Sequence, residues 1–129
     1  MMNPASTVRP PLYCRVRAEA GVAVVELDGE LDLASAPALR EQLLGLLRQG
    51  SSRLVLDLSR VSFCDASGLA VLVGTSHRAR RLGGFLRLAA VPRQAVRVLD
   101  LTGLDRHLLV FPTVWAAAGL PAAQHGRAA

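Results

Sequence analysis

The stretch LVLDLSRVSFCDASGLAVLVG, residues 54–74, contains three structural signals in a row. Leu54 to Leu58 is a short, nearly continuous apolar run, which is typical of a strand covered on both faces of a sheet. The residues from 59 to 67 are mostly polar and predict a loop. From Gly68 to Leu82 the apolar residues recur at helical spacing. A buried strand that leads through a loop into a helix predicts an α/β fold.

The segments on either side continue this alternation. The expected strands are 12–17, 22–28, 54–58, 85–89 and 108–111, and the expected helices are 38–49, 68–82, 92–101 and 113–118. A short connection at residues 19–21 makes the first two strands a hairpin. The predicted order is therefore β-β-α-β-α-β-α-β-α. It indicates an α/β domain with a mixed, mostly parallel sheet of about five strands and four helices.

The ends of these elements carry their own signals. Ser35 is the expected N-cap of the first helix, and Gly50 is expected to end it. In the third helix, Val96 and Leu99 are expected to face the core. We expect one domain over residues 12–118, between a flexible arm at 1–11 and a flexible tail at 119–129.

Composition excludes several classes of protein. The chain has 129 residues, of which 51% are apolar and 19% charged, so it is not globally disordered. All 15 basic residues are arginine, and apart from a cluster at 77–81 they are scattered, with no interleaved aromatic residue for nucleic-acid binding. Two cysteines cannot form a disulfide framework and are expected to be buried thiols. No signal peptide or membrane span is apparent, which predicts a soluble, cytoplasmic protein.

Most enzyme motifs are missing. Without lysine the chain cannot build a Walker A loop, and it has neither a GxGxxG nor a GxSxG sequence. The histidines are expected to be solvated rather than catalytic or metal-binding; they are His77, His107 and His125. Alternate acidic residues at the end of the second strand predict a polar sheet edge, with a metal-binding cluster as the less favoured alternative; they are Glu26, Asp28, Glu30 and Asp32.

The segment Asp65-Ala66-Ser67-Gly68-Leu69 suggests chemistry at a helix start. Asp65 or Ser67 can accept hydrogen bonds from the free amides of the first turn. Gly68 lacks side-chain bulk, so another molecule could approach the backbone. A hydroxyl held at a helix N-terminus is also a suitable phosphate acceptor, because the free amides and the dipole favour an anion. On spacing alone, the favoured interpretation is that Ser67 is only a cap.

The run VSFCDASGLAVLVG, residues 61–74, resembles the signature of the STAS domain, and in particular of bacterial anti-sigma factor antagonists. The turn GELD at 29–32, the DLS at 57–59 and the run RVLDLTGL at 97–104 are also similar to this family. The resemblance covers roughly residues 12–118, and the predicted order of elements is the family's own.

The resemblance implies a role for each matching residue. Ser67 corresponds to the serine that a partner anti-sigma factor with serine kinase activity phosphorylates. Asp65 would orient that serine, Gly68 would leave room for the kinase, and Asp32 would lie near the phosphosite. Ala66 stands where many relatives have serine or threonine, so Ser67 is the only hydroxyl between residues 64 and 72. The implied surface around the phosphosite comprises Glu30, Asp32, Asp65, Ala66, Gly68 and Leu69.

The family also implies partners and a mechanism. The unphosphorylated antagonist binds the anti-sigma factor and frees the sigma factor, and a serine phosphatase resets the phosphorylated form. The antagonist would itself be no enzyme, need no cofactor and act as a monomer or weak dimer. An alternative is a stand-alone STAS domain that serves as a subunit or nucleotide-responsive module of another complex, in lipid transport, stressosome-like assemblies or sensing. A serine hydrolase built on Ser67 is least favoured, because no base is adjacent in sequence.

Overall fold

The computed structural model describes residues 12–119 and begins with an antiparallel hairpin. Strand β1 (Tyr13–Glu19) pairs with β2 (Val22–Leu31) in a register that places Glu19 opposite Val22. The two turn residues both have positive φ, 53° at Ala20 and 83° at Gly21. Positive φ at both central positions is what a two-residue hairpin turn requires to match the twist of its strands. The predicted hairpin is thus confirmed.

The remaining elements alternate as the sequence predicts. They are α1 (Ala36–Arg48), β3 (Arg53–Cys64), α2 (Ala66–Arg81), β4 (Phe85–Ala89), α3 (Arg93–Thr102), the 3-10 turn η2 (Leu104–Arg106), β5 (Leu109–Phe111) and α4 (Val114–Ala117). The sheet order is β1-β2-β3-β4-β5, with β1 antiparallel and all later pairs parallel. The predicted mixed α/β fold of five strands and four helices is therefore confirmed. The predicted arm at 1–11, and the predicted tail beyond residue 119, lie outside the described residues.

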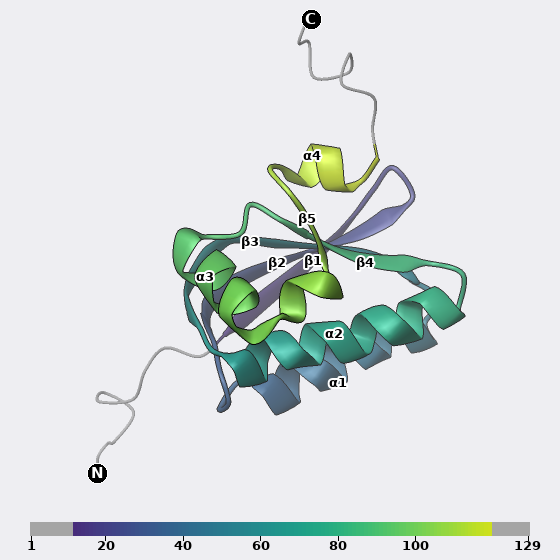
Figure 1. Ribbon diagram of the computed structural model, residues 1–129. Coiled ribbons are helices and arrows are strands. Elements are labelled where there is room, and N and C mark those ends of the chain that lie inside the picture. The colour runs from purple at the N-terminus through teal and green to yellow at the C-terminus, as the bar shows by residue number, and fades with distance from the viewer. Residues whose placement is uncertain (1–11, 120–129) are drawn as a thin grey trace, which may run out of the picture.

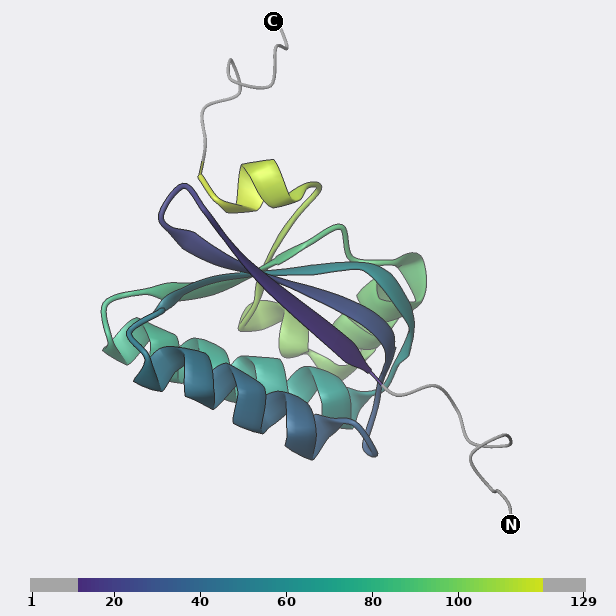
Figure 2. The same cartoon turned by 180° about the vertical axis from the view of Figure 1, so that it is seen from behind.

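The helices divide unequally between the two faces of the sheet. Each strand from β2 onward is followed by its neighbour in the sheet, so right-handed crossovers place α1, α2 and α3 on one face. The short α4 lies on the opposite face (Figures 1 and 2). The main core lies under the three long helices and is mostly leucine, including Leu27, Leu43, Leu56, Leu72 and Leu88. A smaller core of Val22, Val24, Val55, Ala89 and Ala117 lies under α4.

Arg87 of β4 holds α4 against the sheet. Its guanidinium lies 3.7 Å from the centre of the Phe85 ring, and its Nη1 donates a 3.0 Å hydrogen bond to the carbonyl of Ala117. Thr113 caps the helix by accepting a hydrogen bond from the amide of Ala116. A four-residue helix gains little stability from its own hydrogen bonds, so these anchors hold it in place.

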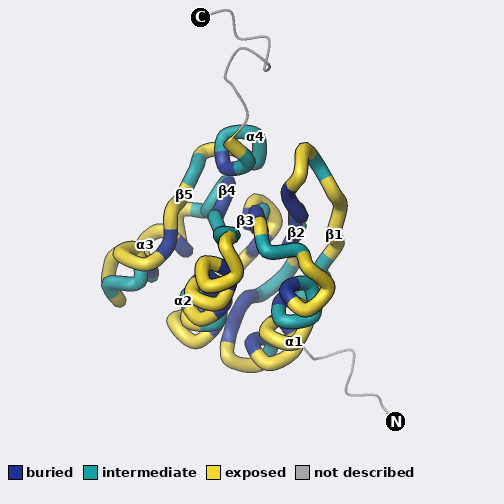
Figure 3. The backbone as a smooth tube through the Cα atoms, turned by 90° about the vertical axis from the view of Figure 1, so that its right-hand side faces the viewer, coloured by how far each residue is buried: buried dark blue, intermediate teal, exposed yellow. Residues whose placement is uncertain are grey.

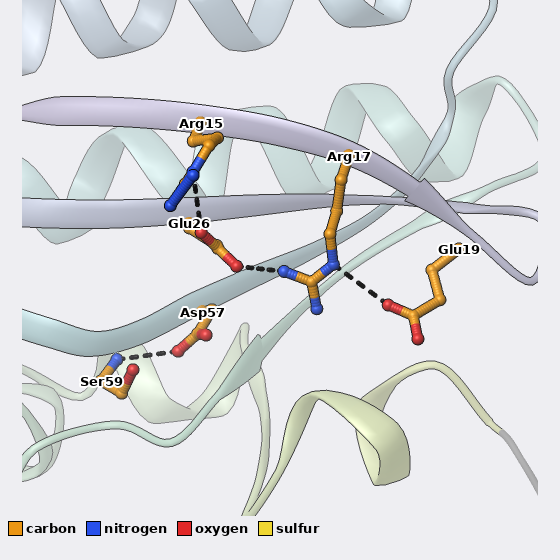
Figure 4. Close-up of polar contacts among 6 residues, drawn as sticks. All are labelled: Arg15, Arg17, Glu19, Glu26, Asp57 and Ser59. Atoms are coloured by element: carbon orange, nitrogen blue, oxygen red, sulfur yellow. Dashed lines mark hydrogen bonds and ion pairs between the residues drawn. The ribbon is translucent and has the colours of Figure 1, made fainter.

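The part of the sheet that α4 leaves uncovered carries charged side chains (Figure 4). Glu26 on β2 pairs with two arginines of β1, with Arg15 at 3.3 Å and with Arg17, and Arg17 also pairs with Glu19 at 3.1 Å. Asp57 accepts a 2.9 Å hydrogen bond from the amide of Ser59. Exposed pairs of this kind contribute about 0–1 kcal/mol each. These ion pairs make this face of the sheet polar, and they do not form a binding site.

Strand β3 is much longer than predicted, because it runs on to Cys64 where the sequence indicates a loop. Its second half pairs with the end of β2, from Asp28 opposite Arg60 to Leu31 opposite Cys64. The register slips twice along this pairing, and slips of this kind are β-bulges that break the alternation of faces. Both slips add a residue to β3, so β2 keeps its alternation: Leu27 and Leu31 are buried, whereas Glu26, Asp28 and Glu30 are half-buried or exposed. Asp32 lies beyond the end of β2 and is buried, so the expected row of four acidic residues ends at Glu30. Within residues 12–119, no three His, Cys, Asp or Glu side chains gather as metal ligands.

Two smaller expectations need correction. Val96 on α3 is exposed, whereas Ala95 and Leu99 are buried in the core and Val98 packs against it. Cys14 is only half-buried, whereas Cys64 is buried as expected, and both are free thiols. No helix in the described part of the chain is long and apolar enough to cross a membrane.

Candidate functional site

Strands β2 and β3 end side by side, and Asp65 ties the two ends together. Its amide donates a 3.1 Å hydrogen bond to the carbonyl of Leu31, the last residue of β2. Its carboxylate Oδ2 accepts a 3.1 Å bond from the amide of Leu33, in the loop that follows β2. Parallel strands bring their carboxyl ends to one edge of a sheet, where loops commonly carry function. The GELD turn and the DASG segment therefore meet here.

Asp65 is also the N-cap of α2. Its backbone is extended, with φ −123° and ψ 177°, and its Oδ1 accepts a 2.9 Å hydrogen bond from the amide of Gly68. Of the two capping residues that the sequence allows, the structure uses Asp65. One carboxylate thus serves two elements, since one oxygen caps α2 and the other holds the β2–α1 loop.

Ser67 is exposed in the first turn of α2, as is Ala66 beside it. It lines a hollow between α1 and α2, so its side of the helix borders α1. The amides of Ala66 and Ser67 belong to the first turn, where no helical carbonyl is within reach. A group attached to the hydroxyl would meet unpaired N–H groups and the positive end of the helix dipole.

Gly68 and Leu69 differ from the expectation that they face a partner, because both are buried. A Cβ at Gly68 would lie 2.3 Å from the carbonyl oxygen of Leu31 and 2.8 Å from its Cγ. Glycine is therefore required for close packing of α2 on the end of β2, not to leave room for another molecule. Leu69 is fully buried among the core leucines.

Asp32 lies in the corner between β2 and α1 and is only 4% exposed. Its Oδ1 accepts a 3.0 Å hydrogen bond from the amide of Ser35, while its own amide donates a 3.0 Å bond to Ser35 Oγ. Ser35 Oγ donates in turn to the carbonyl of Glu30 at 2.8 Å. Ser35 does occupy the N-cap position of α1, but its hydroxyl bonds backward into the loop and caps nothing. The loop next to the Ser67 site is thus rigidly closed, and Glu30 at its start is half-buried.

The sequence reasoning missed three residues at this end of the sheet. Leu33 is 69% exposed and Phe63 is 39% exposed, so two apolar side chains lie in solvent near Asp65. Gln94 on α3 braces the end of β3, because its side-chain amide exchanges two 2.9 Å hydrogen bonds with the backbone of Cys64. An apolar residue in a predicted loop could have drawn attention to Leu33. Nothing in the sequence links Gln94 to a residue thirty positions away.

The two cysteine thiols both have raised pKa values. Burial raises the pKa of the Cys64 thiol to about 11, with a further contribution from the negative charge of Asp65, so the thiol stays protonated and unreactive near neutral pH. Burial likewise raises the pKa of Cys14. His77 lies ten residues beyond Ser67, about 15 Å along the helix, and its ring packs edge-on against His107 at 5.8 Å.

The fold and this site define a small α/β domain with a mixed five-stranded sheet, in which Ser67 is exposed at the start of α2. The family model of the STAS domain matches residues 13–117, and the chain belongs to this family.

Several of its relatives are named as anti-sigma factor antagonists. The chain is 42% identical over 80 residues to the anti-sigma-B factor antagonist of Bacillus subtilis, covering 62% of this chain and 72% of that protein. It is 36% identical over 96 residues to the anti-sigma-F factor antagonist RsfB of Mycobacterium tuberculosis, covering 73% and 76%. The crystal structure of an anti-sigma factor antagonist from Mycobacterium paratuberculosis superposes with a TM-score of 0.76 at 31% identity, covering 87% of this chain and 97% of that one.

Proposed function

We propose that this chain is an anti-sigma factor antagonist whose docking is switched by phosphorylation of Ser67. The single observation that carries the proposal is the exposed hydroxyl of Ser67 in the first turn of α2, in a chain similar to proteins named as such antagonists. The partner is an anti-sigma factor with serine kinase activity, and a serine phosphatase restores the free hydroxyl. The chain acts in the cytoplasm and catalyses nothing itself, since the ATP chemistry belongs to the partner.

The unmodified site suits a protein partner. The exposed Leu33 and Phe63 supply apolar surface. Apolar side chains surrounded by a polar rim are typical of the centre of a protein interface. Asp65 holds the Leu33 loop and the start of α2 in one arrangement, so the surface is formed before the partner arrives. A preformed surface loses less entropy on binding.

Phosphorylation acts on this surface by charge. A phosphoserine carries about −1.5 to −2 charges at neutral pH and would lie within two residues of the Asp65 carboxylate. The free amides of the first turn offset part of that charge inside the chain, but a partner built to contact a neutral hydroxyl would meet repulsion and a desolvation cost. No change of fold is needed for release.

The test compares three forms of the chain with the anti-sigma factor that co-purifies with it from its host. Unmodified chain and Ser67→Ala bind with similar affinity in a calorimetric titration, and Ser67→Ala gains no phosphate by intact mass. The phosphorylated chain binds at least about a hundredfold more weakly, since each 1.4 kcal/mol is tenfold in affinity.

Ser62→Ala is the matched control, because Ser62 is also exposed but lies on β3 outside the helix start. Ser62→Ala is still phosphorylated on Ser67, and its phosphorylated form still releases the anti-sigma factor. A phosphate found on any residue other than Ser67, or undiminished binding of the phosphorylated chain, contradicts the proposal.

A further inference from the structure

A basic groove separates α1 from α2 on the side of the molecule away from the sheet. Two adjoining hollows of about 530 and 430 Å³ share Leu44, Arg78 and Arg81 as walls, so they form one groove. Ser67 lines one end of it and Leu82 the other. These residues are fifteen positions apart on α2 and its C-terminal cap, which corresponds to about 22 Å. The sides of α1 and α2 that face away from the sheet are largely exposed (Figure 3).

The lining of the groove combines apolar and positive groups. Leu44 and Leu47 of α1 contribute apolar surface, and Leu82 stands 58% exposed at the far end. Four arginines complete the walls: Arg40, Arg48, Arg78 and Arg81. No acidic residue lines either hollow in the described part of the chain. Four like charges along a narrow groove attract an anionic ligand and repel a basic one.

The charge decides between the possible occupants. The segments outside the described residues, 1–11 and 120–129, contain no acidic residue and carry one arginine each, so neither complements the groove. A second copy of this chain, at net charge +5, is disfavoured in the same way. A flat membrane cannot enter a recess between two helices. The described lining of the groove has no Phe, Tyr or Trp ring to stack on nucleic-acid bases, and the ring of its one histidine, His77, already packs edge-on against His107. An acidic segment with apolar residues fits all of these features.

We propose that the α1–α2 groove binds an acidic amphipathic helix of the anti-sigma factor, a second contact that continues from Ser67. This inference rests on the proposed function and adds the chemistry of the partner's contact. A helix of about fifteen residues spans the groove, with apolar side chains on the leucines and carboxylates on the arginines. Phosphate on Ser67, at one end, brings about −2 charges against four positive ones and so weakens attraction along the groove.

The experiment neutralises two arginines of the groove and compares a matched control. Arg78→Gln/Arg81→Gln removes two exposed charges from α2. Arg15→Gln/Arg53→Gln removes two exposed charges from strands β1 and β3, away from the groove. Binding of each double variant and of wild type to the co-purifying anti-sigma factor is titrated at about 0.1 M and about 1 M salt, where the Debye lengths are ~10 Å and ~3 Å. Unfolding curves check that both variants remain folded.

Arg78→Gln/Arg81→Gln is expected to bind about tenfold more weakly than wild type in low salt, with little difference in high salt. The control, Arg15→Gln/Arg53→Gln, keeps wild-type affinity at both salt concentrations. Equal binding of both double variants overturns the groove contact and leaves the Ser67 switch standing. Wild type and Arg78→Gln/Arg81→Gln are also sedimented with phosphatidylserine vesicles. If the variant no longer sediments with the vesicles but still binds the anti-sigma factor as wild type does, the groove contact is overturned in favour of a membrane surface. A wild-type chain that binds no anti-sigma factor refutes the proposed function itself, and the inference with it.

Discussion

Two serines stand at the starts of neighbouring helices, but one is bonded into a loop and the other is exposed. Ser35 and Ser67 each follow a parallel strand and stand at the start of a helix, at the same edge of the sheet. Ser35 is half-buried, and its hydroxyl is bonded to the carbonyl of Glu30 and the amide of Asp32. Ser67 is exposed and borders the groove between α1 and α2.

The spacing of a neighbouring aspartate accounts for the difference. Asp32 precedes Ser35 by three residues, so serine and aspartate exchange hydrogen bonds and close the loop. Asp65 precedes Ser67 by two residues, and its carboxylate reaches past the serine to the amide of Gly68. At the start of α2, the aspartate therefore caps the helix and leaves the Ser67 hydroxyl available. Residue type alone does not distinguish a structural serine from a displayed one.

The sharpest way to break this comparison is to remove each hydroxyl in turn. After incubation with the kinase partner and ATP, Ser67→Ala takes up no phosphate, whereas Ser35→Ala takes up as much as wild type. Stability follows the opposite order. Ser35→Ala loses about 1 kcal/mol, because two hydrogen bonds in the loop disappear, and Ser67→Ala stays close to wild type. Intact mass and urea unfolding measure the two effects, and phosphate on Ser35 would overturn the distinction.

A second test concerns the close packing that positions the displayed serine. Gly68→Ala forces a Cβ against the carbonyl of Leu31, and overpacking of this kind costs about 2–3 kcal/mol. Gly74 lies on the same helix, and a Cβ there would meet nothing within 4 Å, so Gly74→Ala should stabilise by about 0.5–1 kcal/mol. Equal effects of the two substitutions in urea unfolding would show that Gly68 is not a packing requirement.

A third test concerns the double role assigned to Asp65. Asp65→Ala removes the cap of α2 and the bond to the Leu33 amide, for a loss of about 1–2 kcal/mol. Native-state hydrogen exchange should speed up at the amides of Leu33 and Gly68 together. Asp100→Ala, on the exposed side of α3, serves as the control and should change neither stability nor exchange there. If exchange at the Leu33 amide were unchanged in Asp65→Ala, Asp65 would cap α2 without holding the β2–α1 loop.

The sequence predicts the elements better than their limits. Helix periodicity in residues 38–49 and 68–82 depends on local spacing, so it is legible without a partner. The second half of β3 cannot be predicted in this way, because Arg60 to Cys64 become a strand only by pairing with the end of β2, with bulges in β3. The expectation that Val96 faces inward fails for a similar reason: spacing defines an apolar stripe, but packing on the sheet decides that Ala95 and not Val96 faces it.

The candidate site divides in the same way. Ser67, Asp65 and Asp32 are visible in the sequence, because their spacing and the family resemblance both mark them. The exposure of Ser67, the burial of Gly68 and the apolar side chain of Leu33 in solvent depend on how two loops meet at the sheet edge. The brace of Gln94 on Cys64 likewise joins residues that only the crossover to α3 brings together.

By itself, the amino-acid sequence determined the order of strands and helices, the family and the residue type at the helix start. These follow from periodicity, capping spacing and motif, which act over a few residues. Only the tertiary structure decided which serine is displayed, which glycine is a packing contact and that α1 and α2 enclose a groove lined by arginines. Each of these depends on contacts between segments some thirty residues apart, and such contacts form only when the right-handed crossovers bring those segments together.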